Sequence, residues 1–205
     1  MSTWLIWLLV ATGFGAVAAR RPTVAAILVT SQTLLLGAGA LAMAPGRSSE
    51  FAVAAALLML KAALVTGIVA VAISRTREAR PHAGGSGLLN RVGAAVVLVL
   101  VVVALVPGYG LESAAAENGA SALLATGLAL ALVRSATIFA VLAFLVAENG
   151  IAVAAVSVTG ALPLVVELGI AFDLVLLIAV AAVFQSRILA AFGTTDSSAL
   201  RGPRG

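Results

Sequence analysis

Four ionisable side chains lie inside apolar stretches of this sequence, where a charge is unfavourable. They are one lysine and three acids: Lys61, Glu148, Glu167 and Asp173. On insertion scales a charged residue at the centre of a membrane helix costs about 2.5–3.5 kcal/mol, and such residues usually face a bundle interior or a watery cavity. A carboxylate held there can take up and release a proton without any cofactor. The pattern therefore predicts proton or Na⁺ movement along a row of titratable groups.

Each of these groups also has a structural interpretation. Glu167 could lie in the outer interfacial region, and Asp173 could be an ion-pair partner that fixes Lys61. Glu148 and its neighbour Asn149 could form hydrogen bonds between helices, as polar side chains do in membrane proteins. Lys61 could pair with an acid of this chain or of a neighbouring subunit.

The composition places these groups in a bilayer. Of 205 residues, 62% are hydrophobic and only 10% are charged, whereas soluble domains carry roughly 25% charged residues. The net charge of +4 comes mostly from arginines in short gaps between apolar runs, which argues against nucleic-acid binding. There is no cysteine, and the single histidine, His82, lies in a polar loop. We therefore expect no metal or cofactor site in this chain.

The expected fold is an all-α integral membrane protein with about seven transmembrane helices. A spanning helix needs about 20 mostly apolar residues, and we identify candidates at 4–19, 23–44, 51–74, 88–106, 119–133, 136–159 and 162–184. The first has no basic residues before its apolar run, so we expect a retained helix and not a cleaved signal. We divide the chain into a three-helix unit (1–74), a loop with linker helices (75–133) and a C-terminal unit (134–205).

The arginines favour an orientation with the N-terminus outside and the C-terminus in the cytoplasm. In that orientation the outside gaps hold only Arg47, while the cytoplasmic segments hold Arg20, Arg21, Arg75, Arg77, Arg80, Arg91, Arg134, Arg187, Arg201 and Arg204. This asymmetry agrees with the positive-inside rule. Residues 119–147 could instead be one helix with Arg134 buried, but that would put Arg187 outside. The charge pattern therefore favours two helices here.

An internal repeat supports the same plan. Residues 57–75 align without a gap to 169–187, so that Lys61 falls on Asp173, each fourteen residues before an arginine. The two units have the same orientation only if an odd helix separates them, which predicts three helices, one linker helix and three helices. Gln32 and the small-residue spacings Gly13–Gly15 and Gly37–Gly39 predict close helix packing.

The segments AENGIAV (147–153), ALPLVVELGIAFDLVLLIAVAAVFQSRIL (161–189) and GTTDSSALRG (193–202) resemble the hydrogenase-4 component E family. Its members are membrane subunits of energy-converting group 4 [NiFe]-hydrogenases. The family's E-N-G motif matches Glu148, Asn149 and Gly150, and its second motif matches 164–171 with Glu167, followed by Asp173. The resemblance is strong over 144–202 and only architectural over 1–110.

The C-terminal third is also similar to the K subunit of bacterial complex I and to the C subunit of Mrp-type antiporters. In this type of small membrane subunit, two successive helices each carry a membrane glutamate on the proton path. Glu148 matches the first and Asp173 the second. An aspartate in place of the second glutamate leaves a partner-stabilising role open.

The resemblance implies a non-redox, non-catalytic subunit of an oxidoreductase complex in a bacterial or archaeal cytoplasmic membrane. Its neighbours would be antiporter-like large membrane subunits, other membrane-arm subunits and the electron-transfer subunits that carry the Ni–Fe and iron–sulfur centres. Glu148 and Asp173 would belong to a proton or Na⁺ path, with Lys61 and Glu167 as secondary members. The alternatives are a subunit of an Mrp-type cation/proton antiporter and a purely structural scaffold.

Overall fold

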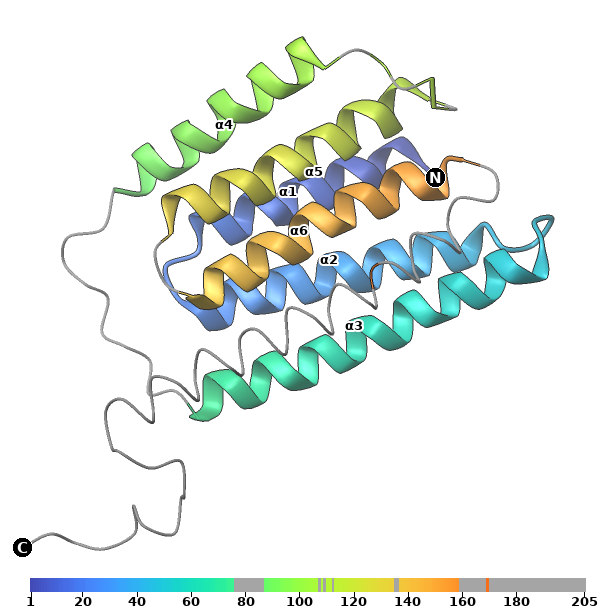
Figure 1. The fold of residues 1–205 in the computed structure, drawn as a ribbon, viewed down its shortest axis with the longest axis horizontal. Coiled ribbons are helices and arrows are strands. Elements are labelled where there is room, and N and C mark those ends of the chain that lie inside the picture. Colours follow the sequence, from blue (N-terminus) through green and yellow to red (C-terminus); the bar gives the residue numbers. More distant parts are fainter. Residues whose placement is uncertain are drawn as a thin grey trace, which may run out of the picture. The chain divides into compact units, whose positions relative to one another are not determined.

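Every element that the structure describes is a helix. The computed structural model describes residues 1–75, 87–106, 113–134 and 137–158, together with Gly108, Gly110, Leu111 and Gly169. Its six helices are α1 (Thr3–Ala18), α2 (Pro22–Ala42), α3 (Ser49–Arg75), α4 (Leu88–Leu105), α5 (Ala114–Val133) and α6 (Thr137–Val156) (Figure 1). The predicted seventh helix, 162–184, lies outside the described residues except for Gly169.

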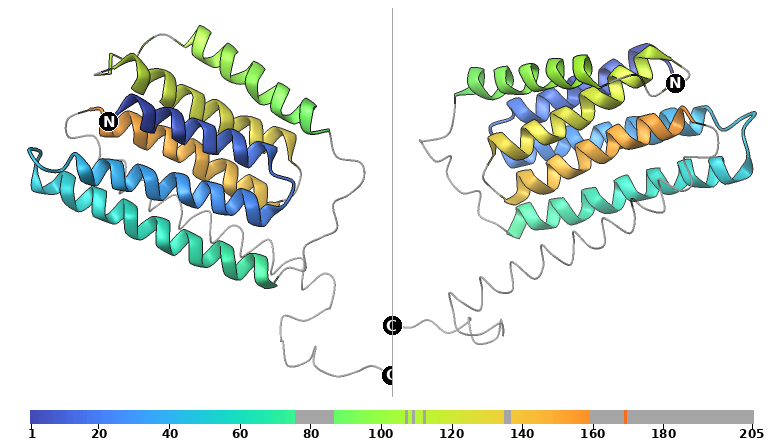
Figure 2. Two further views of the ribbon diagram at one scale, coloured as in Figure 1. Left: turned by 180° about the vertical axis from the view of Figure 1, so that it is seen from behind. Right: turned by 45° about the horizontal axis from the view of Figure 1, so that its top comes forward.

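The six helices run alternately up and down within one compact unit, residues 1–167 (Figure 1). Helix α5 packs against α1, α4 and α6, and α2 packs against α1, α3 and α6. Helices α3 and α4 therefore lie on opposite flanks of a central group made of α1, α2, α5 and α6, as both views in Figure 2 show. A polar group on α3 can reach this central group through the α2 and α6 side.

The helices have the length and composition of membrane spans. Four of them, α2, α4, α5 and α6, are long and apolar enough to cross a bilayer, and α1 is apolar but only 16 residues long. These features confirm the prediction of a helical membrane protein. The first four helices begin and end within two residues of the predicted segments.

The break at Arg134 confirms that residues 119–147 are not one helix. Helix α5 ends at Val133, Arg134 has extended backbone angles, and α6 begins at Thr137. Helix α5 begins five residues earlier than predicted, at Ala114, because the Ser113 side chain caps its first turn by accepting a hydrogen bond of 3.1 Å from the backbone N–H of Ala116.

The arginines gather at one end of the six-helix unit. The α1–α2 connection, the end of α3, the start of α4 and the end of α5 all lie at that end (Figure 1). They carry Arg20, Arg21, Arg75, Arg91 and Arg134. The opposite end holds the α2–α3 connection with Arg47, the start of α3 with Glu50 and the start of α5 with Glu117.

Helices α5 and α6 touch through their backbones at two glycines. A Cβ atom added to Gly127 would lie 2.6 Å from the carbonyl oxygen of Ala143, and one added to Gly150 would lie 2.9 Å from that of Ala120. Successive helical residues are about 100° apart around the axis, so Glu148 lies on the opposite side of α6 from Gly150. The contact at Gly150 thus turns Glu148 away from α5.

The predicted glycine spacings also mark close contacts. A Cβ atom on Gly37 would meet Met59 Sδ at 2.8 Å, and one on Gly13 would meet Gln32 Nε2 at 3.2 Å. The prediction of close helix packing at these positions is therefore confirmed.

The α5–α6 contact can be tested with Gly127→Ala. The new methyl group would meet backbone atoms, which cannot rotate away, so we expect a loss of about 1–3 kcal/mol in stability, measured by thermal unfolding in detergent. Gly93→Ala on α4 is the matched control, because a Cβ there meets nothing within 4 Å, and a helical Gly→Ala change otherwise stabilises. Equal stability of the two variants would contradict the close contact.

Candidate functional site

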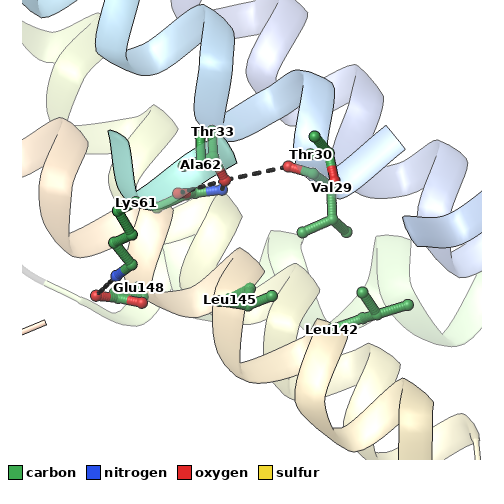
Figure 3. Close-up of a pocket in the computed structure, with 9 residues that line it drawn as sticks. Val29, Thr30, Thr33, Lys61, Ala62, Leu142, Leu145 and Glu148 are labelled. Atoms are coloured by element: carbon green, nitrogen blue, oxygen red, sulfur yellow. Dashed lines mark hydrogen bonds and ion pairs between the residues drawn. The ribbon is translucent and has the colours of Figure 1, made fainter. Parts of the chain in front are cut away.

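The centre of the site is an ion pair between α3 and α6. Lys61 Nζ contacts Glu148 Oε1, and both residues lie near the middle of their helices (Figure 3). Only 9% of the Lys61 side chain and 13% of the Glu148 side chain are exposed. The two charges are thus largely withdrawn from solvent. Their attraction is much stronger in this apolar interior than at a surface.

A small cavity lies beside this pair, between α2, α3 and α6. Its volume is about 10 Å³, close to the space that one water molecule needs. Thr30 and Thr33 of α2 line it, and so do Leu142 and Leu145 of α6 (Figure 3). Hydroxyl groups and a carboxylate give such a water hydrogen-bonding partners, whereas the leucines keep the rest of the wall apolar.

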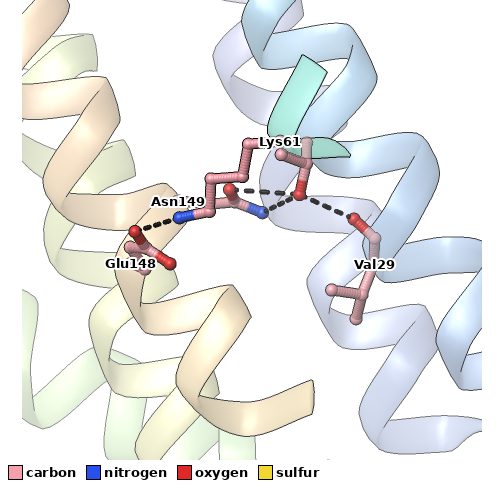
Figure 4. A network of polar contacts seen from close by, with 5 residues as sticks. Val29, Lys61, Glu148 and Asn149 are labelled. Carbon is pink, nitrogen blue, oxygen red and sulfur yellow. Dashed lines mark hydrogen bonds and ion pairs between the residues drawn. The ribbon is translucent and has the colours of Figure 1, made fainter. Parts of the chain in front are cut away.

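Asn149, the residue after Glu148, forms hydrogen bonds with two polar side chains of α2. Its Nδ2 donates hydrogen bonds to Gln32 Oε1 at 2.8 Å and to Thr33 Oγ1 at 3.0 Å. The Thr33 hydroxyl lies 3.1 Å from the carbonyl oxygen of Val29 and 3.2 Å from Asn149 Oδ1, and its single proton can serve one of them at a time (Figure 4). Gln32 and Asn149 are buried.

Gln32 extends these contacts to a third helix. Its Nε2 donates a hydrogen bond of 2.7 Å to the carbonyl oxygen of Leu9 on α1. Polar atoms therefore connect α1, α2 and α6 directly beside the ion pair. Hydrogen bonds between membrane helices contribute about 0.6–2 kcal/mol each, so this network holds the wall of the cavity in place.

This arrangement suits the exchange of ions better than the making or breaking of covalent bonds. A carboxylate paired with an ammonium and next to room for water can exchange one cationic partner for another, either a proton or a small metal ion. Among the described residues no group of three or more His, Cys, Asp or Glu side chains could hold a metal ion. The site in the described residues is therefore a buried ion pair in an apolar helix bundle.

The structure brings together two of the four ionisable residues singled out by the sequence. Lys61 finds an acid of its own chain, Glu148. Glu167 and Asp173 lie outside the described residues, so their place on one path with Glu148 stays a prediction. The structural interpretation of Asn149 is confirmed, because it joins helices by hydrogen bonds.

Sequence reasoning missed Thr33. It treated Gln32 as a packing residue, and the structure gives Gln32 that place, with hydrogen bonds to two helices. The available signal was the run of four polar residues, 30–33, in an apolar helix. Their partner across the interface was not readable from spacing, because 116 residues separate Thr33 from Asn149.

A double-mutant cycle tests the ion pair. Lys61→Met should destabilise the chain by about 3–5 kcal/mol, because it leaves a buried carboxylate without this partner. Adding Glu148→Gln should restore most of that loss, as measured by unfolding in detergent. Leu60→Met, at an exposed position on the same helix, should have little effect. Strictly additive single effects would contradict a direct interaction.

Comparison with known proteins identifies a mycobacterial relative. The uncharacterized protein Rv0085 of Mycobacterium tuberculosis (strain ATCC 25618 / H37Rv) is 33% identical over 159 residues, which cover 73% of this chain and 70% of the mycobacterial protein. No protein-family model matches the chain, and no solved structure matches it. The chain belongs to the same protein family as Rv0085.

Proposed function

We propose that this protein is a non-redox membrane-arm subunit of an energy-converting hydrogenase or a related respiratory complex. In this role Glu148 forms part of a proton or Na⁺ path driven by electron transfer in partner subunits. The observation that carries the proposal is the Lys61–Glu148 ion pair, which lies mid-helix, largely buried and beside a water-sized cavity.

The energetics of such a pair favour a functional role. A buried ion pair is weak evidence for stability, because well-packed apolar residues of similar volume are often as stable or more so. Ionisable residues inside membrane segments instead mark ion pathways and proton relays. Lys61 Nζ contacts a carboxylate oxygen of Glu148, and a proton or cation that reaches the cavity competes with Lys61 for the same oxygen atoms.

The proposed topology has seven spans, arranged as three, one and three helices, with the N-terminus outside. One end of the six-helix unit carries most of the described arginines: Arg20, Arg21, Arg75, Arg91 and Arg134. This asymmetry supports a cytoplasmic location for that end. In this topology Asp173 and Glu167 of the seventh helix are the next members of the path.

The choice of complex rests on the resemblance to the hydrogenase-4 component E family, through Glu148, Asn149 and Gly150 and through the segment that contains Glu167 and Asp173. It suggests a bacterial or archaeal cytoplasmic membrane, antiporter-like large subunits as neighbours and Ni–Fe and iron–sulfur centres in partner chains. This subunit would contribute carboxylates and no cofactor ligands.

Two other functions explain some of the same observations. A subunit of an Mrp-type cation/proton antiporter would use the same buried carboxylate without any redox partner. A scaffold subunit is favoured by the network of Gln32, Thr33 and Asn149, which joins three helices. These functions differ in what copurifies and in what a neutral Glu148 changes.

The first test is Glu148→Gln in the assembled complex, with ion pumping and electron transfer measured separately in membrane vesicles. Because a positioned proton-transfer group typically contributes about 10²–10⁴-fold, we expect pumping to fall by about 100-fold while the complex still assembles. Glu50→Gln, at an exposed position at the start of α3, is the matched control and should pump normally.

The outcomes separate the three functions. Normal pumping by the Glu148→Gln complex would contradict the relay, and loss of assembly with normal pumping in the remainder would favour the scaffold. Metal analysis of the complex purified through this subunit decides the rest. Nickel and iron support the hydrogenase complex, whereas cation/proton exchange without either metal supports the antiporter.

A further inference from the structure

Two arginines meet where α4 begins and α5 ends. Arg91 lies in the first turn of α4, and Arg134 follows the last residue of α5, a helix that packs against α4. Burial and then the positive charge of Arg91 lower the pKa of Arg134 below its ordinary value. An arginine stays protonated all the same, so two positive charges are held together at this end of the bundle.

Arg91 is buried, Arg134 is partly buried, and both carry buried N–H donors without a partner among the described residues. Arg91 is only 7% exposed. Its Nε atom, and the Nε and Nη2 atoms of Arg134, are buried and have no hydrogen-bond partner in the described part of the chain. Buried polar atoms of proteins are nearly always paired, and an unpaired charged donor is especially unfavourable. These donor atoms therefore call for an acceptor that the described residues do not supply, and two adjacent positive charges favour an anionic one.

An aromatic ring and the N-termini of two helices lie near these arginines. Phe139, in the first turn of α6, lies under the Arg134 guanidinium with 4.2 Å between Cζ and the ring centroid. The ring covers one face of that group, so its hydrogen bonds have to form at the N–H edge. The starts of α4 and α6 are both nearby, the α4 start has no side-chain cap, and helix N-termini attract anions.

We infer that Arg91 and Arg134 form a binding site for the phosphate group of an anionic phospholipid. Guanidinium groups bind phosphate oxygens through paired N–H donors, which matches the unpaired Nε and Nη2 atoms of Arg134 and the unpaired Nε atom of Arg91. A lipid fits the location, because α4 is the outermost helix on this flank and exposes large apolar side chains along its length, among them Leu89, Val97, Leu100 and Leu105. These side chains provide a surface for acyl chains next to the headgroup. The inference does not depend on the proposed ion path.

The test uses the full-length chain in a neutral detergent, with binding of phosphatidylglycerol, phosphatidylcholine and inorganic phosphate measured by native mass spectrometry and thermal stabilisation. We expect phosphatidylglycerol to bind about tenfold or more tightly than phosphatidylcholine. Arg91→Gln/Arg134→Gln should remove that preference, since charge-assisted hydrogen bonds account for an effect of about this size.

Two further variants make the result specific. Arg20→Gln/Arg21→Gln removes two exposed arginines from the same end of the bundle and should keep the preference. Arg91→Lys/Arg134→Lys keeps the charge and protects folding if the glutamine variant fails, but it loses the paired donors and should weaken binding by several-fold.

Unchanged lipid preference in both the glutamine and the lysine variants would overturn the proposal. Arginine-dependent binding of inorganic phosphate, with no preference among the lipids, would overturn the lipid as the source of the phosphate. The preference for phosphatidylglycerol could also fall equally in Arg20→Gln/Arg21→Gln and in Arg91→Gln/Arg134→Gln. That result would show an effect of surface charge alone and would likewise overturn the site.

Discussion

A carboxylate in the middle of an apolar helix bundle must be paired, neutralised or hydrated, and Glu148 meets this requirement with Lys61. The pair joins α3, whose main helix contact is α2, to α6 in the central group. Because either charge alone would be strongly unfavourable there, the helices have to be arranged so that both arrive at one place. A small cavity lies beside the pair, and in the proposed function it gives a proton or a cation access to the carboxylate.

The close packing of α5 and α6 sets the direction in which Glu148 faces. At Gly150 the α6 backbone lies against α5, so the side of α6 that bears Glu148 is turned toward α3. Asn149, about a quarter of a turn away, faces α2 and forms hydrogen bonds with Gln32 and Thr33. The three consecutive residues of the E-N-G motif thus have three separate tasks: charge, interhelical bonding and close backbone contact.

The helices were predictable because long apolar runs and arginine-bearing breaks are local signals, and Arg134 correctly divided α5 from α6. Lys61 and Glu148 were conspicuous in the sequence, since each is an ionisable group in an apolar helix. Their pairing was not predictable, because it depends on how α3 and α6 pack across 87 residues of sequence. For the same reason Thr33 was missed, since a hydroxyl in a helix usually bonds its own backbone and only the fold brings it to Asn149. Asp173 and Glu167 lie outside the described residues.

In the proposed function, Glu148 changes its partner when the complex works. The most direct test is infrared difference spectroscopy of the assembled complex between its oxidised and reduced states, compared with the Glu148→Gln complex. We expect a carboxyl signal that appears and disappears with turnover in the unmodified complex and is missing from the variant. A Glu148 carboxylate that keeps the same signal through turnover, in a complex that pumps, would contradict it.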